Sequence, residues 1–86
     1  MDFVDFALLV NASSFVSINQ LKTKLKQYTV EGLRKRLDSL CSQGLMESLV
    51  INHKTFYRTT KEGVQATMAF YKKYDLEKLK YSLSFL

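Results

Sequence analysis

The sequence predicts a mostly helical α+β fold in which a two-stranded β-hairpin lies between the third and the fourth helix. Apolar residues recur at helical spacing from Val30 to Cys41 and stop before Gly44, a residue typical of helix C-termini. β-Branched and aromatic residues flank a polar tip between 47 and 59, which indicates strand, turn and strand. A length of 86 residues without a proline indicates one domain, 1–86.

The first predicted helix covers residues 2–11, where nearly every residue is apolar. A short surface helix does not need so much apolar area, so we expect part of it to meet a partner. One face of this first helix carries Phe3, Phe6, Ala7 and Val10. After the helix, a brief extended segment is predicted at Phe15 and Val16.

Two helices follow, separated by a short turn. Ser17 is the predicted N-cap of the first of them, and Gln20 completes a capping box. Thr29 is the predicted N-cap of the next helix, which runs over residues 30–43. The buried side chains are predicted to be Ile18, Leu21 and Leu25 in the second helix and Val30, Leu33, Leu37, Leu40 and Cys41 in the third.

The predicted hairpin spans residues 47–59, with strands over 47–51 and 55–59 and a turn over 52–54. Thr60 then caps a last helix over 61–86, and Glu62 in its first turn suits the positive end of the helix dipole. Asp75 either breaks this helix or caps a second segment, and the sequence leaves both readings open.

The net charge of +5 lies entirely between Lys22 and Arg36. This stretch holds six basic residues and one acidic residue, whereas the rest of the chain holds seven of each. A local positive field on an otherwise neutral body indicates a place where a polyanion docks.

Other classes of function are poorly supported. One cysteine, Cys41, and one histidine, His53, give neither an internal disulfide nor a recognised metal site, and we expect no enzyme, no metal and no cofactor. The longest apolar run, from Phe6 to Val10, is far shorter than the roughly 20 residues of a membrane span. No secretory signal is visible at Met1, so an intracellular location is expected.

The element order and several short patterns resemble a known family. The patterns are leucines 21 and 25, leucines 33, 37 and 40, the pair Gly44 and Leu45, and the run from Tyr57 to Gly63. Over about residues 17–63 they resemble winged helix-turn-helix regulators of the MarR-like and PadR-like kinds and small archaeal and archaeal-virus winged-helix proteins. The run 57–63 is similar to the Y-x-L-T-x-x-G exit from their wing. Two features depart from the family pattern. Thr59 stands in place of the leucine, which predicts weaker packing under the wing. The wing is also short and has little basic charge beyond Lys54 and Arg58.

The resemblance implies that the helix over 30–43 enters the DNA major groove and that the wing over 47–59 lies near the backbone or the minor groove. Recognition positions then fall on Thr29, Glu31, Gly32, Arg34 and Lys35. The helical wheel independently points Lys35, Gly32, Glu31 and Ser39 away from the leucines, with Arg34 and Arg36 on the flanks. We expect Arg34 and Lys35 to lie at or near bases, and His53 and Lys54 at the wing tip. Phosphate contacts are expected from Lys22, Lys24, Lys26 and Arg36.

The terminal helices, 2–11 and 61–86, predict a homodimer. A chain this short buries only about 60% of the surface that it exposes when unfolded. These helices carry more apolar surface area than one small core can bury, and a second copy of the chain could cover the rest. The predicted interface residues are Phe3, Phe6, Val10, Phe70, Tyr74, Leu76, Leu79 and Leu83.

These expectations combine into a dimeric, sequence-specific regulator of transcription that binds double-stranded DNA, acts as a repressor and needs no cofactor. Two alternatives stay open. An architectural protein that coats DNA would share the fold and the charge but show little sequence preference. A protein-interaction module would use the winged helix only as a scaffold.

Overall fold

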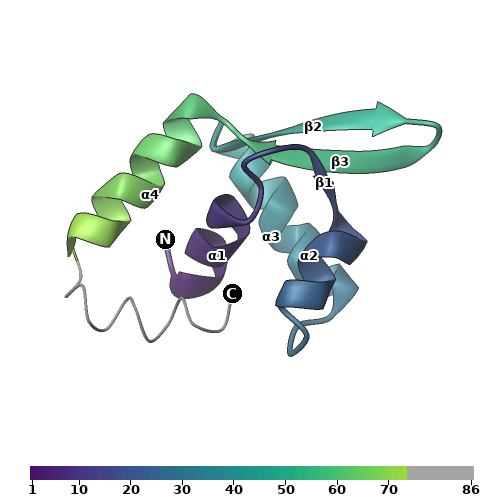
Figure 1. Ribbon diagram of the computed structural model, residues 1–86, viewed down its shortest axis with the longest axis horizontal. Helices are drawn as coiled ribbons and strands as arrows, with labels where there is room; N and C mark the ends of the chain where they lie inside the picture. Colours follow the sequence, from purple (N-terminus) through teal and green to yellow (C-terminus); the bar gives the residue numbers. More distant parts are fainter. Residues whose placement is uncertain (74–86) are drawn as a thin grey trace.

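The computed structural model describes residues 1–73, over which four helices and a three-stranded antiparallel sheet form a mostly helical α+β fold (Figure 1). The predicted fold class is therefore confirmed at this level. The part of the predicted last helix beyond residue 73 lies outside the described residues. The elements are α1 (Phe3–Val10), β1 (Val16–Ser17), α2 (Ile18–Lys24), α3 (Val30–Ser42), β2 (Met46–Ile51), β3 (Lys54–Thr59) and α4 (Lys61–Lys73).

Side-chain caps define where the helices begin. The predicted capping box of α2 is present: Gln20 N donates to Ser17 Oγ at 3.2 Å, and Ser17 N donates to Gln20 Oε1 at 2.8 Å. Thr29 Oγ1 accepts from Gly32 N at 3.0 Å at the start of α3. Thr60 Oγ1 accepts from Gly63 N at 3.1 Å at the start of α4. Each cap satisfies a backbone donor that the first helical turn leaves without an acceptor, and the predicted caps are confirmed.

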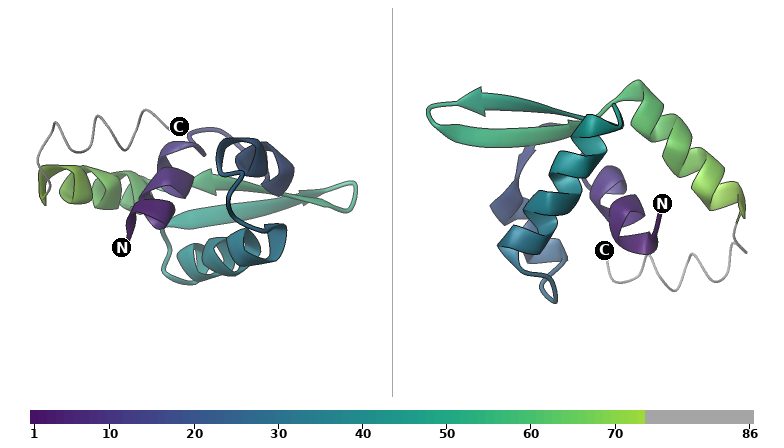
Figure 2. Two further views of the ribbon diagram at one scale, coloured as in Figure 1. Left: turned by 90° about the horizontal axis from the view of Figure 1, so that it is seen from below. Right: turned by 180° about the vertical axis from the view of Figure 1, so that it is seen from behind.

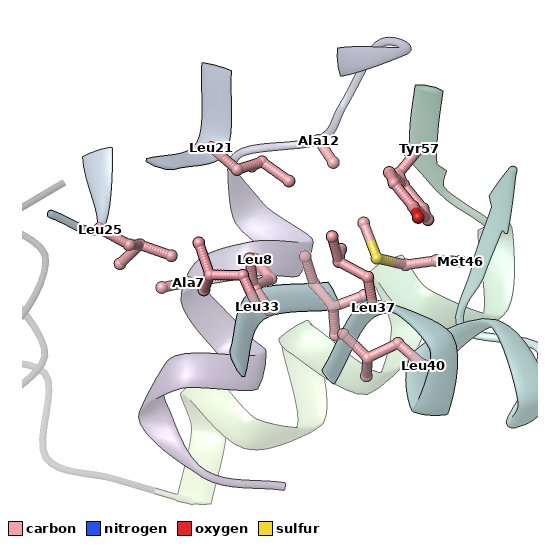
Figure 3. Close-up of a cluster of buried hydrophobic side chains, with 11 residues drawn as sticks. Ala7, Leu8, Ala12, Leu21, Leu25, Leu33, Leu37, Leu40, Met46 and Tyr57 are labelled. Carbon is pink, nitrogen blue, oxygen red and sulfur yellow. The ribbon is translucent and has the colours of Figure 1, made fainter. Parts of the chain in front are cut away.

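The core lies between the sheet and the helices α1, α2 and α3 (Figures 1 and 3). Burying a leucine contributes about 1.5 to 3 kcal/mol, so the leucine stripe of α3 is a main source of stability. This stripe also fixes which side of α3 faces solvent. The most deeply buried large side chains are Leu8, Leu21, Leu33, Leu37 and Leu40.

α1 lies between α3 and α4, so it buries two sides (Figures 1 and 2). Phe70 of α4 stacks on Phe6 with ring centroids 4.9 Å apart and meets Phe3 edge-on at 5.3 Å. Phe6 and Phe70 are only 3% and 7% exposed. Each ring is therefore largely buried against the other within one chain, and their predicted place in a dimer interface stays a prediction. Of the predicted interface residues, Phe3 and Val10 stay exposed, and Tyr74, Leu76, Leu79 and Leu83 lie outside the described residues.

β3 is the central strand, with β1 on one side and β2 at the other edge. The β2–β3 register runs from Met46 opposite Thr59 to Ile51 opposite Lys54. The connecting turn is therefore two residues long, Asn52 and His53, rather than the predicted three, because Lys54 pairs within the sheet. Both turn residues have a positive φ, 50° and 66°, as a type I′ turn requires.

Replacing His53 with glycine is expected to raise the free energy of unfolding by about 1 kcal/mol, because a non-glycine residue pays for a left-handed conformation. Urea denaturation followed by circular dichroism measures the change. Asn52→Gly is the matched control, and it should gain less because asparagine tolerates this conformation. A destabilised His53→Gly variant would contradict the strain at this position.

Thr59 joins the sheet to α1. Its Oγ1 donates to Leu9 O at 2.6 Å, and its backbone N donates to Ala12 O at 2.8 Å. The sequence predicts that a threonine here weakens the packing under the hairpin. The structure adds that the buried hydroxyl has a hydrogen-bond partner, which a leucine side chain would not use.

Candidate nucleic-acid interface

α3 presents a polar face on the side opposite its buried leucines. Glu31, Arg34, Lys35 and Ser39 are all exposed, as the helical wheel predicts. Within residues 1–73, no carboxylate forms an ion pair with Arg34 or Lys35. These two cations are therefore available to a ligand. Glu31 and Asp38 are exposed on the same helix, so its polar face carries both signs of charge.

The start of α3 is held by Thr29 and Gly32. The Thr29 hydroxyl, a predicted recognition group, accepts the Gly32 N–H and so caps the helix. A Cβ added at Gly32 would lie 3.1 Å from this hydroxyl oxygen. Gly32 therefore leaves space for the Thr29 hydroxyl that caps the helix. The sequence suggests a second role for this glycine, which is to allow a close approach to DNA.

The predicted phosphate-binding lysines differ in their surroundings. Lys24 and Lys26 are exposed at the end of α2 and in the turn before α3. Lys22 is half-buried, and its Nζ donates to Lys26 O at 2.7 Å. Lys22 therefore closes the turn between α2 and α3, and Lys24 and Lys26 remain as the better candidates for contact with phosphates.

Arg36 points toward α1 instead of the polar face of α3. Its Nη1 lies 2.8 Å from Asp2 Oδ2 and 3.3 Å from Asp5 Oδ1. Desolvation works against the charged form of Asp2, but hydrogen bonds from the Asp5 N–H and from Arg36 outweigh it and lower the pKa of this carboxyl. The pKa of Arg36 is raised, first by the hydrogen bond to Asp2. In this structure Arg36 links α3 to α1, and its expected phosphate contact stays a prediction.

The hairpin contributes one exposed cation at its tip, Lys54, beside the exposed His53. The other basic residue of the hairpin, Arg58, is engaged: its Nε donates to Glu47 Oε1 at 2.8 Å, and its guanidinium lies 4.4 Å from the centre of the Phe15 ring. Next to the turn, the last three residues of β2 are apolar and exposed: Leu49, Val50 and Ile51. The prediction of two strands did not single out these residues, although three consecutive apolar residues break the alternation of a strand with one buried face.

Tyr57 places the hairpin against one flank of α3. Burial raises the pKa of its hydroxyl, Asp38 adds to the shift, as does Cys41 once it ionises at alkaline pH, and Arg34 opposes it. All three of these groups belong to α3. Tyr57 is also part of the buried core that holds the leucines of α3, so this side of the hairpin packs toward α3.

Cys41 is half-buried beside the core, as its place on the leucine stripe predicts. Burial raises the pKa of its thiol, and Asp38 adds to the effect. A raised pKa keeps the thiol protonated near neutral pH, so the side chain packs as a small hydrophobe.

No group of three or more potential metal ligands occurs within residues 1–73.

An apolar groove of about 340 Å³ lies between α1 and α4. Its lining comes from α1 and α4 alone, whereas the basic stretch lies on α2, on α3 and in the turn between them. The groove is lined by Phe6, Val10, Thr67, Met68, Tyr71 and Lys72.

Across residues 1–73, no helix combines the length and the apolar character that a bilayer span requires.

Comparison with known proteins leaves the family open. No protein-family model matches the chain, and no curated protein sequence matches it.

Proposed function

We propose that this protein is a dimeric, sequence-specific regulator of transcription that binds double-stranded DNA through a winged helix-turn-helix and acts as a repressor. The observation that carries the proposal is the polar face of α3, where Arg34 and Lys35 are exposed and unpaired among residues 1–73 while the opposite face is fixed in the core. A rigid helix with free cations is the element that reads a major groove.

In this proposal α3 is the recognition helix and the β2–β3 hairpin is the wing. Arg34 and Lys35 contact guanine edges or nearby groups, since both side chains donate to the acceptors that guanine presents. Lys24 and Lys26 contact phosphates and supply much of the affinity. Two copies related by a two-fold axis would place their α3 helices about 34 Å apart, one turn of DNA, on a near-palindromic site.

The direct test is selection of bound duplexes from a random DNA pool, followed by footprinting and titration of the selected site. We expect protection of two half-sites about one turn apart. For about four phosphate contacts per dimer, affinity should fall about a hundredfold between roughly 50 and 200 mM salt. A selected site that competes no better than bulk DNA would favour an architectural protein instead. Unchanged gel mobility of duplex DNA at low salt would contradict the proposal and favour a protein-interaction module.

The dimer is proposed to form along the groove between α1 and α4. The support is its apolar lining, which includes the exposed Val10, together with the exposed Phe3 on the same helix. Sedimentation at micromolar concentration tests it, with Val10→Glu as the disrupting variant, which we expect to sediment as a monomer. A folded wild-type monomer at this concentration would rule the dimer out.

A further inference from the structure

The outer edge of β2 is open. Among residues 1–73, β2 pairs only with β3, and it forms the margin of the sheet on the side away from β1 (Figure 1). An edge strand presents unpaired N–H and C=O groups, and proteins commonly guard such an edge with lysine, proline or a bulge. The six residues of β2, MESLVI, include neither lysine nor proline, and their register with β3 runs without a bulge.

The register of the hairpin determines which backbone groups point outward. Ile51 and Lys54 close the two-residue turn, so they form a hydrogen-bonded pair, and hydrogen-bonded and non-hydrogen-bonded pairs alternate from there along the strands. Ser48 and Val50 therefore belong to non-hydrogen-bonded pairs with β3. Their N–H and C=O groups point to the open edge.

We propose that the open edge of β2 pairs in antiparallel fashion with the same edge of a second copy of the chain, so that two hairpins form one continuous sheet. The two-fold axis passes beside Leu49. Ser48 then lies opposite Val50 of the second copy, and these outward-pointing residues exchange four backbone hydrogen bonds across the axis. The inference concerns assembly of the protein and does not rest on DNA binding.

Apolar side chains on one face of the hairpin favour this register. Leu49 and Ile51 are 42% and 50% exposed, and Leu49 pairs with Phe56 of β3 on the same face. The register places Leu49 against Leu49 of the second copy, with a Phe56 on either side. On the other face, Val50, which is 65% exposed, comes opposite Ser48. Cross-strand contacts and burial of apolar surface therefore stabilise the pairing on both faces.

The charges of the hairpin favour a second copy as the occupant. Glu47 is the only acidic residue between positions 46 and 59, and Arg58 donates to it. In the proposed register Glu47 lies opposite Ile51 of the second copy, whose own partner on β3 is Lys54. Two strand spacings, about 10 Å, then separate the Cα atoms of Glu47 and this Lys54, a distance that two long side chains can span. Each acidic residue thus lies between two cations, and no like charges come opposite each other.

The contact is small, because about five residues of each copy take part. It belongs with the transient interfaces below about 1,200 Å², so we expect it at higher protein concentration than the groove dimer. A dimer formed along the groove would carry two such edges, and pairing at both would join dimers into longer assemblies.

Cysteine trapping tests the register. In a Cys41→Ala background, Leu49→Cys places the thiol at the axis, where the two Cα atoms of a non-hydrogen-bonded pair lie about 4.5 Å apart, within the reach of a disulfide. Ile51→Cys is the matched control, because it is exposed on the same face but lies about 13 Å along the strands from its copy. Under mild oxidation at about 1 mM protein, we expect Leu49→Cys to cross-link at least about tenfold faster than Ile51→Cys.

Hydrogen exchange of the wild type is the second measurement, and it needs no substitution. The amides of Ser48 and Val50 should exchange at least about twofold more slowly at about 1 mM protein than at about 0.05 mM, because pairing protects them. The amides of Leu49 and Ile51 are internal controls, since they donate to β3 at both concentrations.

Three results would overturn the inference. Equal rates of cross-linking for the two cysteine variants would indicate random collision instead of pairing. Exchange at Ser48 and Val50 that does not change with protein concentration would leave the edge open. Slower exchange of these two amides with duplex DNA, and not with protein concentration, would make DNA the occupant. Thermal unfolding of both cysteine variants near the wild-type temperature verifies that the fold is kept.

Discussion

Replacing Gly63 with alanine is expected to destabilise the protein by about 3 kcal/mol, near the upper end of overpacking effects. A Cβ at this position would lie 2.1 Å from Leu45 O and 2.6 Å from Thr59 Cγ2. Leu45 O already accepts from Thr60 N at 3.0 Å, and Thr59 is held by its hydrogen bonds to Leu9 O and Ala12 O. The clash therefore cannot relax without loss of other contacts. In a domain of this size the melting temperature should fall by about 15 °C.

Gly32 supplies the matched control for Gly63. Both glycines follow a capping threonine by three residues, in the segments Thr-Val-Glu-Gly and Thr-Lys-Glu-Gly, and both donate their N–H to the threonine hydroxyl. An alanine at 32 would meet only a side-chain oxygen, at 3.1 Å. Gly32→Ala should therefore cost little, or gain some of the roughly 1 kcal/mol by which alanine exceeds glycine in helices. Equal effects of the two substitutions would contradict the close packing at Gly63.

The double variant Arg34→Ala and Lys35→Ala is expected to lower the affinity for the selected DNA site about a hundredfold. Each base contact of such a side chain is worth about 1 to 3 kcal/mol. Fluorescence anisotropy with a labelled duplex measures the loss. The affinity for bulk DNA should fall less, because base contacts carry the sequence preference.

The control for this variant is Lys61→Ala with Lys73→Ala, which removes the same charge from exposed positions of α4 outside the groove. It should change affinity by less than about threefold, since exposed charges remote from the DNA are largely screened by salt. Equal losses for the two double variants would reduce the role of α3 to net charge. Equal losses on selected and bulk DNA would contradict base reading by Arg34 and Lys35.

Much of the fold could be predicted because its signals are local. The Ser17 and Thr29 caps, the leucine spacing of α3 and the glycine at 44, whose φ is +76°, each depend on residues a few positions apart. The side of α3 that faces solvent followed from the same leucines. These signals fixed where Arg34 and Lys35 lie without knowledge of any distant contact.

What the sequence did not reveal are contacts between residues far apart along the chain. The aromatic pair Phe6 and Phe70 gives the same apolar signal whether it meets a second chain or, as here, the other end of its own chain. The pairing of Arg36 with Asp2 and Asp5 needs the position of α1, which no periodicity in α3 encodes. The hydrogen bond from Thr59 to Leu9 O joins residues fifty positions apart.

That same hydrogen bond decides how the N-terminal segment opens. A first helix of eight residues would ordinarily fray and exchange its amide hydrogens quickly. Here Thr59 holds both Leu9 and Ala12 to the central strand of the sheet. Opening of α1 therefore breaks contacts of β3 as well, and the amides of α1 should exchange with the protection of global unfolding.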